Sequence, residues 1–518
     1  MADDVGDDVG DDGLDLTLLT DLYQLTMASG YWARKCAQRR AVFHLYFRRS
    51  PFQGGYVVAA GLQPALEYLA KFRFCDQALT YLSTLRGNDG QSLFPDEFLR
   101  VLGDLRLSVD VQAVPEGTVV FPHQPLLRIE GPIMQCQLLE STLLNIINFQ
   151  SLIATKAARI VQAAAGDAVL EFGLRRAQGV DGALAASRAA FIGGCAATSN
   201  VLAGMRFGIP VRGTHAHSWV MSFDSELESF AEYAAAMPNN CVFLVDTYDT
   251  IAGVRHAIEI GQQLRAHGHD MVGIRLDSGD LAWLSLQARR LLDEAGFPRA
   301  TIVASNDLDE RLIQSLKSQG SAINVWGVGT KLATAYDQPA LGGVYKLAAI
   351  EERHHQNSAA DLPNDTMSPS ETIRWRPVLK LSEQPSKVST PGKLQVRRFF
   401  SANGEARADM IFNELDPPRN VWTMVNPEDA TQQRTFAHDR FQDLLIPVML
   451  GGKRIYDLPT IANIQKNTQR ELEQFHSGIR RFDNPHRYPV GLERSLHELR
   501  QRLMRDGRAV AQREGRRS

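Results

Sequence analysis

Two histidines stand one residue apart in the segment GTHAHSW, at His215 and His217. An imidazole that is oriented by a carboxylate can act as a nucleophile or a general base. A pair with this spacing at the mouth of a barrel could instead bind a metal ion, as in a metal-dependent barrel hydrolase. That function needs further histidines at later strand ends, where the sequence has aspartates, at Asp246, Asp277 and Asp307. We therefore favour one reactive histidine over a metal centre.

An arginine and an aspartate lie two residues apart in GIRLDSGD, at Arg275 and Asp277. Side chains with this spacing point to the same face of a strand. The guanidinium is suited to a planar anion such as a carboxylate, which it can bind through two parallel hydrogen bonds. Asp277 can accept hydrogen bonds from ribose hydroxyls or hold a metal ion, and Gly279 allows a ligand to approach the backbone closely. A salt bridge between Arg275 and Asp277 is the alternative interpretation.

A short glycine turn in WGVGT is suited to a phosphate. Gly327, Gly329 and Thr330 would present backbone N–H groups and a hydroxyl after a predicted strand. The segment is neither a Walker A loop nor the glycine pattern of a dinucleotide-binding fold. A kinase or a dinucleotide-dependent enzyme is therefore unsupported.

The segment EFGLRRAQG adds an aromatic ring and two positive charges. Phe172 offers a flat apolar face, and Arg175 and Arg176 follow at the end of a predicted strand. Adjacent arginines on a surface are usually solvated, but beside a phosphate pocket they can act as ligands. Together with the other segments, these residues indicate a substrate that combines a sugar phosphate with a small flat anion.

The candidate residues follow apolar runs that are predicted to be strands. Such runs begin at residues 209, 241, 270, 301 and 322, with amphipathic helices between most of them. This alternation is typical of βα units and a parallel sheet or barrel. The edge where such strands end carries the active site in (β/α) barrels and the ligand in open sheets. We predict one shared pocket at that edge, although each polar residue alone would also suit a helix N-cap.

The rest of the chain divides into segments of different composition. The predicted units are a disordered acidic tail at 1–13, an N-terminal α+β domain at 14–150, an α/β barrel at 151–350, an insertion loop at 351–372, a β-rich segment at 373–462 that completes the domain formed by the two ends of the chain, and a helical basic tail at 463–518. The predicted fold class is α/β, an irregular (β/α) barrel with an α+β, β-rich second domain and a C-terminal helical extension.

Composition excludes several classes of protein. The 518 residues include 56 basic and 59 acidic side chains, and a net charge of −3 argues against a nucleic-acid or membrane-surface partner. Five scattered cysteines without a CxxC motif indicate reduced thiols and a cytoplasmic location. The N-terminus does not have the pattern of a secretory signal, and no apolar run suits a membrane span.

At these residues the chain resembles the nicotinate phosphoribosyltransferase family. The matching segments, in order, are LTDLYQLTM, FRRSPF, EFGLRRAQG, GTHAHSW, LVDTYDT, RLDSGDL, SNDLDE, WGVGT, GGVYKL, KLSE and TPGKLQVRR. The resemblance runs from about residue 14 to about residue 450, apart from the insertion. It implies a type II phosphoribosyltransferase fold and a homodimer whose active sites lie at the subunit interface. It also implies that nicotinate and 5-phosphoribosyl 1-diphosphate form nicotinate mononucleotide and diphosphate, with ATP hydrolysis and Mg²⁺, in NAD salvage.

The resemblance also implies roles for single residues. His217 matches the histidine that ATP phosphorylates, and Asp277 matches the residue that holds the ribose hydroxyls. The implied nicotinate contacts are Tyr23 from the second subunit, Phe172, Thr214, Arg275 and Ser199. The implied phosphate, phosphoribosyl or diphosphate contacts are Arg175, Asn306, Gly327, Gly329, Thr330, Arg49 and Lys393. The Mg²⁺ ligands stay unassigned.

Related functions remain as alternatives. Nicotinamide phosphoribosyltransferase has the same fold and an acidic residue that receives the amide, where this chain has Ser199. A hydroxyl can donate to a carboxylate, so nicotinate is favoured. Quinolinate phosphoribosyltransferase would need a more basic pocket and no ATP-using histidine. A catalytically inactive regulator is disfavoured because the implied site residues are all present.

Overall fold

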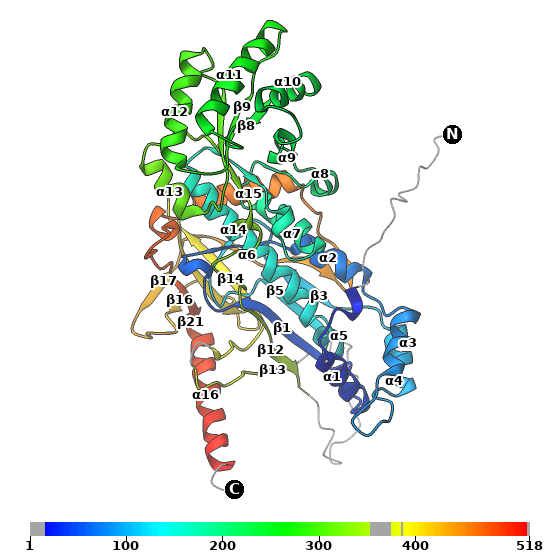
Figure 1. Cartoon of the computed structure of the whole chain (residues 1–518). Coiled ribbons are helices and arrows are strands. Elements are labelled where there is room, and N and C mark those ends of the chain that lie inside the picture. Colours follow the sequence, from blue (N-terminus) through cyan, green and yellow to red (C-terminus); the bar gives the residue numbers. More distant parts are fainter. Residues whose placement is uncertain (1–15, 353–373, 385–386, 515–518) are drawn as a thin grey trace, which may run out of the picture.

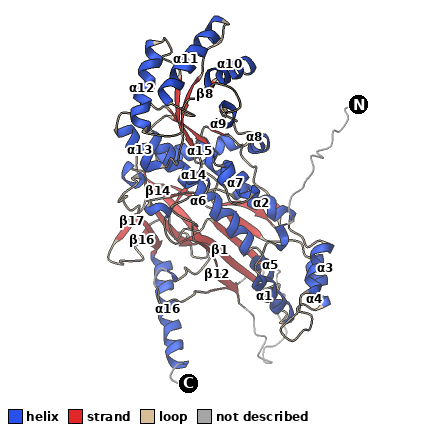
Figure 2. Cartoon of the chain, in the orientation of Figure 1, coloured by secondary structure: helices blue, strands red, loops and turns tan. Residues whose placement is uncertain are grey.

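The computed structural model describes residues 16–352, 374–384 and 387–514 (Figure 1). The protein is a mixed α/β structure with one parallel sheet and separate antiparallel and mixed sheets (Figure 2). The predicted acidic tail at 1–13 and almost all of the predicted insertion at 351–372 lie outside the described residues.

The parallel sheet has six strands in the order β7-β6-β11-β10-β9-β8. They are β6 (Ala168–Glu171), β7 (Ala197–Thr198), β8 (Val242–Leu244), β9 (Gly273–Leu276), β10 (Thr301–Ala304) and β11 (Val325–Val328). Every pairing in this sheet is parallel, which confirms the βα alternation expected from the apolar runs. The strands therefore end at a common edge.

Helices follow the strands and begin at acidic caps. Asp249, Asp280 and Asp309 accept backbone hydrogen bonds at the starts of α11 (Thr250–Ala266), α12 (Leu281–Glu294) and α13 (Glu310–Ser318). A cap satisfies N–H groups that the first helical turn leaves free. The polar residues after each strand thus form two groups. Those nearest the strand line the edge of the sheet, and those a few residues later cap the helix that follows.

The structure corrects one predicted strand. In segment 209–217 the described residues form only an isolated parallel bridge, between Val211 and Thr198. Pro210 has no N–H to donate to a ladder, which limits pairing here. The segment is a loop that leads into the short helix α9 (His217–Val220).

This loop spans the gap between the two outer strands of the sheet. One end bridges Thr198 of β7, and His215 meets β8 at the other side, where its Nε2 accepts the Leu244 N–H at 3.2 Å. The His215 ring packs against Tyr233 and Phe230, with centroid distances of 4.9 and 5.8 Å. The His215 imidazole thus accepts the Leu244 N–H at the edge of the sheet, which would otherwise be buried without a hydrogen-bond partner.

A seven-stranded sheet combines distant parts of the chain, in the order β13-β12-β1-β5-β3-β19-β20. Its strands are β1 (Arg40–Phe47), β3 (Asp110–Ala113), β5 (Leu127–Pro132), β12 (Gly343–Glu351), β13 (Trp375–Pro377), β19 (Ile446–Leu450) and β20 (Lys453–Arg454). The inner strand β1 pairs antiparallel with β12 and β5, so residues as distant in sequence as Ala41 and Ile350 are neighbours. A two-stranded ladder of β2 (Val57–Val58) and β4 (Val119–Val120) completes this part.

A third sheet has the order β17-β16-β21-β15-β14-β18. Its strands are β14 (Leu394–Phe400), β15 (Ala406–Asn413), β16 (Trp422–Val425), β17 (Gln433–Phe436), β18 (Arg440–Asp443) and β21 (Val490–Glu493). The predicted helical segment 463–518 differs from the structure at β21, which lies between β15 and β16 and separates α15 (Ile461–Glu473) from α16 (Arg494–Glu514). Four residues are too short for a periodic signal. Figure 1 shows α16 projecting away from the body of the molecule.

The long helix α6 (Glu140–Ala164) connects the parts. It packs against β6 of the parallel sheet, β12 of the seven-stranded sheet and α7 (Val180–Ile192). Its buried Lys156 and Arg159 both pair with Glu310 of α13, at 2.7 and 2.8 Å. The other helices are α1 (Leu22–Ala33), α2 (Leu62–Lys71), α3 (Asp76–Thr84), α4 (Asp96–Asp104), α5 (Ile133–Leu138), α8 (Val201–Phe207), α10 (Glu226–Ala236) and α14 (Thr330–Ala333). Among the described residues, no helix is long and apolar enough to cross a membrane.

The contact between His215 and Leu244 predicts a pH-dependent stability. Burial chiefly, and also the charge of Arg275, lowers the pKa of His215 from 6.5 to about 4. Below pH 6.5 the unfolded chain binds a proton that the folded chain excludes, so stability falls as pH drops toward 4. His215→Phe keeps an aromatic ring in the cage but neither titrates nor accepts the N–H. We expect wild type to have the higher Tm at pH 8, and its advantage to shrink steadily between pH 6.5 and 4. A Tm difference that is constant over this range would contradict the assignment.

Candidate active site

Arg275 at the end of β9 draws several predicted site residues together. Its Nη1 donates to Thr214 Oγ1 at 3.1 Å, and its Nη2 donates to Asp277 Oδ1 at 3.0 Å. Its Nε donates to Ser305 Oγ at 2.9 Å, and its Cζ lies 5.8 Å from the centroid of the Phe172 ring. The salt bridge considered as an alternative is therefore present, and the same guanidinium also contacts a second strand end and an aromatic face. The arrangement suits recognition of a flat anion.

His217 lies beside this group. Its Nδ1 is 3.1 Å from Thr247 Oγ1, and its Nε2 is 3.8 Å from Asp277 Oδ2. The His217 side chain is 42% exposed, whereas that of Arg275 is 15% exposed. A ligand from solvent can thus reach the imidazole, while the guanidinium lies deeper. Sequence reasoning did not single out Thr247, although it follows the strand-end residue Asp246.

Asp277 is held in its charged form. Burial alone would raise the pKa of Asp277, but the hydrogen bond from Ser305 and the charge of Arg275 outweigh it and place that pKa below its usual value. Its backbone N–H donates to Asp246 Oδ2 at 2.8 Å, and Ser278 Oγ donates to the same oxygen at 2.7 Å. The second oxygen of Asp246 is buried without a hydrogen-bond partner among the described residues.

The predicted phosphate turn follows β11. A Cβ on Gly327 would come within 2.7 Å of the Phe172 ring, so only glycine lets that ring lie over the strand. Gly329 and Thr330 then begin α14. On the neighbouring loop Asn306 and Asp307 have φ values of 95° and 43°, an unusual left-handed pair for residues other than glycine. Strained backbone of this kind concentrates at ligand sites.

Two other predicted residues lie at the same edge. The Ser199 N–H donates to the carbonyl of Glu171, next to Phe172, at 2.9 Å. Arg175 follows Phe172 on the short helix η3 (Leu174–Arg176) and is exposed. The Ser199 backbone is thus bonded to that of Glu171, the residue before Phe172.

Among the described residues, no hydrogen bond or ion pair joins Tyr23, Arg49 or Lys393 to the residues at this edge. Tyr23 is exposed on α1, which lies at the opposite end of the molecule from β8 and β9 (Figure 1). Arg49 is exposed after β1, and Lys393 Nζ pairs with Glu130 of β5 at 2.7 Å.

A cluster of cations on the seven-stranded sheet was missed by sequence reasoning. We call Arg48, Lys346, Lys380 and Arg500 the basic cluster. Burial is the main cause that lowers the pKa of Lys346. The charge of Glu140 opposes this effect, and the charges of Lys380 and Arg48 add to it. Arg48 Nε is buried without a hydrogen-bond partner among the described residues. These cations belong to FRRSPF, GGVYKL, KLSE and the last helix, so no local pattern could have joined them.

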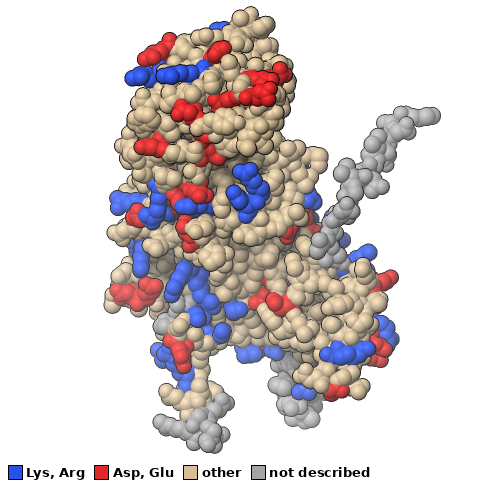
Figure 3. All heavy atoms as spheres, in the orientation of Figure 1, with Lys and Arg blue, Asp and Glu red and all other residues tan. Residues whose placement is uncertain are grey.

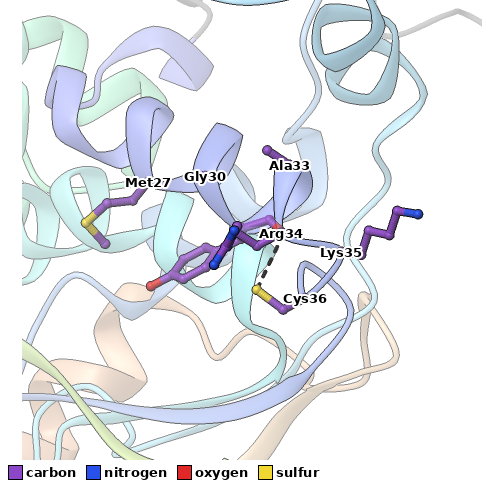
Figure 4. Close-up of a pocket in the computed structure, with 7 residues that line it drawn as sticks. Met27, Gly30, Ala33, Arg34, Lys35 and Cys36 are labelled. Carbon is purple, nitrogen blue, oxygen red and sulfur yellow. Dashed lines mark hydrogen bonds between the residues drawn. The ribbon is translucent and has the colours of Figure 1, made fainter.

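Other surface features carry less information. On the face drawn in Figure 3, acidic and basic side chains are interspersed. A hollow of about 770 Å³ at the end of α1 is lined by Met27, Gly30, Tyr31, Ala33, Arg34, Lys35 and Cys36 (Figure 4). None of the predicted site residues lines it.

Within the described ranges, no group of three or more His, Cys, Asp or Glu side chains is placed to hold a metal ion. His215 uses its Nε2 to accept the Leu244 N–H and lies in an aromatic cage. The HxH pair therefore does not act as a two-histidine ligand set.

Three family models match successive parts of the chain. Residues 18–148 match the nicotinate phosphoribosyltransferase (NAPRTase) N-terminal domain, residues 168–363 the NAPRTase family, and residues 393–500 the NAPRTase C-terminal domain. A nicotinate phosphoribosyltransferase of Mycobacterium tuberculosis is 47% identical, over 93% of this chain and 93% of the relative. That of Bacillus subtilis is 42% identical, over 94% and 96%.

Solved structures agree with these matches. Human nicotinic acid phosphoribosyltransferase superposes with a TM-score of 0.78 and 31% identity, over 93% of this chain and 99% of the human one. A nicotinate-nucleotide pyrophosphorylase from Pyrococcus furiosus, with a TM-score of 0.65 and 20% identity, shares the fold. The identities hold over nearly the whole length and confirm the resemblance seen in the motifs: the chain is an enzyme of the nicotinate phosphoribosyltransferase (NAPRTase) family.

Proposed function

We propose that this enzyme joins nicotinate to 5-phosphoribosyl 1-diphosphate in NAD salvage, with hydrolysis of ATP. The observation that carries the proposal is the Arg275 guanidinium beside the Phe172 ring, within reach of Asp277 and close to His217. A pyridine ring would stack on Phe172. Its carboxylate would be bound by Arg275, with hydroxyls of Thr214 and Ser199 as further donors.

The transfer step needs positioning more than covalent help. The nicotinate nitrogen forms a bond to ribose C1 while the bond from C1 to diphosphate breaks and its electron pair leaves with the diphosphate. The ionised carboxylate of Asp277 would accept hydrogen bonds from the ribose hydroxyls. The turn from Gly327 to Thr330, with Asn306, would hold the 5-phosphate. Fixed orientation and neutralised charge supply most of the rate enhancement in such a reaction.

The residues present fit Mg²⁺ held together with substrate phosphates. The buried free oxygen of Asp246 is a hard donor of the kind that Mg²⁺ prefers. Asp246 and Asp277 would hold the ion, with phosphate oxygens of the substrate as the other ligands. Bound Mg²⁺ neutralises charge on the diphosphate.

His217 would couple ATP to the transfer. If Nδ1–H donates to Thr247, the lone pair on Nε2 is free to attack the γ-phosphate of ATP. A nitrogen–phosphorus bond forms, the bond to ADP breaks, and water later hydrolyses the phosphohistidine. A phosphoryl group at this point would order arginine-bearing loops around it.

The second half of the site would come from the partner of a homodimer. Tyr23 lies on α1, away from β9 in one chain, and the basic cluster is suited to diphosphate or ATP. Exposed apolar side chains occur near the start of α1, at Leu19 and Leu22, and on α8, at Val201, Leu202 and Met205. Apolar groups of this kind mark interaction surfaces.

We also propose that the parallel sheet is part of an irregular barrel and that the enzyme is cytoplasmic. The loop at 209–217, bonded to both outer strands, supports an irregular barrel. The family models at 18–148 and 168–363 support a boundary near residue 150, whereas the model at 393–500 runs across the predicted boundary at 462. Unpaired cysteines, at Cys36, Cys75, Cys136, Cys195 and Cys241, support a cytoplasmic enzyme.

A product assay tests the substrate assignment. Purified enzyme is given nicotinate, nicotinamide or quinolinate with 5-phosphoribosyl 1-diphosphate, each with and without ATP. We expect nicotinate mononucleotide, stimulated by ATP, because Arg275 and Ser199 both favour a carboxylate. Equal turnover of nicotinamide would overturn the preference for the acid, and quinolinate turnover independent of ATP would overturn the function.

His217→Ala tests the coupling to ATP. The variant lacks the nucleophile but keeps Arg275, Phe172 and Asp277, so we expect weak transfer that ATP no longer stimulates. The measurement is the rate of nicotinate mononucleotide formation with and without ATP, together with ³²P retained on the protein. ATP stimulation equal to that of wild type would refute the phosphohistidine.

Complementation tests the shared site. Tyr23→Ala should raise the KM for nicotinate about tenfold, which corresponds to ~1.4 kcal/mol of lost stacking. Mixing it with Arg275→Ala after mild dissociation should restore about a quarter of wild-type sites, since half of the dimers are mixed and one of their two sites is intact. Activity that stays at the level of the unmixed variants would argue against a site built from two subunits.

A further inference from the structure

A buried carboxylate, Glu171, lies directly behind the candidate nicotinate pocket. It ends β6, is 1% exposed and takes no part in the chemistry above. We propose that Glu171 is a positioning residue that sets the distance between the Phe172 ring and the Ser199 hydroxyl, and so determines affinity for nicotinate over nicotinamide. The inference rests on the proposed function and extends it to a residue outside the pocket.

One oxygen of Glu171 holds the turn that carries Phe172. The Gly173 N–H donates to Glu171 Oε1, and the Phe172 N–H donates to the Val328 carbonyl at 2.8 Å. The space around Gly173 is closed, because a Cβ there would lie 2.3 Å from Ala333 Cβ and 3.0 Å from the Gly329 carbonyl. Phe172 is therefore fixed between the carboxylate and the phosphate turn.

The other oxygen holds the segment that carries Ser199. Thr198 Oγ1 donates to Glu171 Oε2 at 2.6 Å and accepts the Asn200 N–H at 3.0 Å. Ser187 Oγ from α7 lies 2.9 Å from the same oxygen. The Ser199 N–H is bound to the Glu171 carbonyl. Both neighbours of Ser199 in the chain thus depend on one carboxylate.

The Glu171 carboxylate is suited to hold both segments firmly. Hydrogen bonds to a buried carboxylate are charge-assisted, and removing the acceptor would leave two hydroxyls and a backbone N–H competing for new partners. A ligand that stacks on a ring and bonds through its carboxylate needs those two contacts at a fixed separation. A displacement of about 1 Å weakens such binding strongly even when the contact residues are intact.

Paired substitutions test the inference on the full-length enzyme. We expect Glu171→Ala and Thr198→Val to raise the KM for nicotinate about tenfold or more and to lower the nicotinate-to-nicotinamide ratio of kcat/KM. The KM for 5-phosphoribosyl 1-diphosphate should rise by less than the KM for nicotinate, because the turn from Gly327 to Thr330 makes no bond to the Glu171 carboxylate. Thr198→Ser keeps the hydroxyl and Glu171→Gln keeps an acceptor for Gly173, so both should restore most of the affinity.

A matched control separates positioning from general loss of structure. Glu493 is also a buried glutamate and accepts the backbone N–H groups of Ser495 and Leu496, in a different sheet from Glu171. Glu493→Ala should lower Tm without changing the KM for nicotinate. If Glu171→Ala does not fold, the comparison of Thr198→Val with Thr198→Ser decides.

Two results would overturn the inference. One is a parallel rise of both KM values that follows Tm, and the other is Thr198→Val with wild-type kinetics and specificity. Failure of the proposed function has a different signature, since wild-type enzyme would then form no nicotinate mononucleotide.

Discussion

The Arg275 guanidinium is the group on which the geometry of the active site depends. It donates to three oxygens from separate segments of the chain and faces an aromatic ring. A cation that is only 15% exposed has lost most of its water, so it requires acceptors and a nearby negative charge. Those acceptors, on Thr214, Asp277 and Ser305, are the same atoms that shape the pocket. The charge of Arg275 therefore holds the loops that carry these residues in place, and the loops form a site that is suited to a flat anion.

The surrounding fold gives this group fixed partners. Parallel strands end at one edge, and acidic caps such as Asp249 and Asp280 hold the starts of the helices that follow. Behind the pocket, Glu171 holds the Phe172 turn and the Ser199 segment. Below it, Glu310 pairs with two cations of α6 and ties the helix after β10 to the rest of the core. The site is precise because its loops are bonded to rigid elements on each side.

One chain carries only part of the machinery that the family resemblance assigns. Phe172, Arg275 and His217 lie at the edge of the parallel sheet, whereas Tyr23 and the basic cluster lie on other elements. The cluster concentrates positive charge, with Lys346 Nζ 3.7 Å from the carboxylate of Glu140. Like charges held close together repel one another, and an anion bound between them relieves the repulsion. A homodimer that brings this surface to the Arg275 pocket of its partner would supply that anion as substrate.

The amino-acid sequence determined the features that depend on neighbours in the chain. Alternating apolar runs and helical segments identified the parallel strands, and motif spacing identified Arg275, Asp277 and His217, because strand periodicity and turns are local properties. The four-residue strand β21 and the loop at 209–217 were not predicted, since pairing there depends on distant strands and on one proline. Only the tertiary structure decided that His215 closes the sheet edge, that Glu171 unites two halves of a pocket, and that the basic cluster exists. These arrangements arise when groups far apart in the chain meet after burial, and burial removes the water that would otherwise satisfy each group alone.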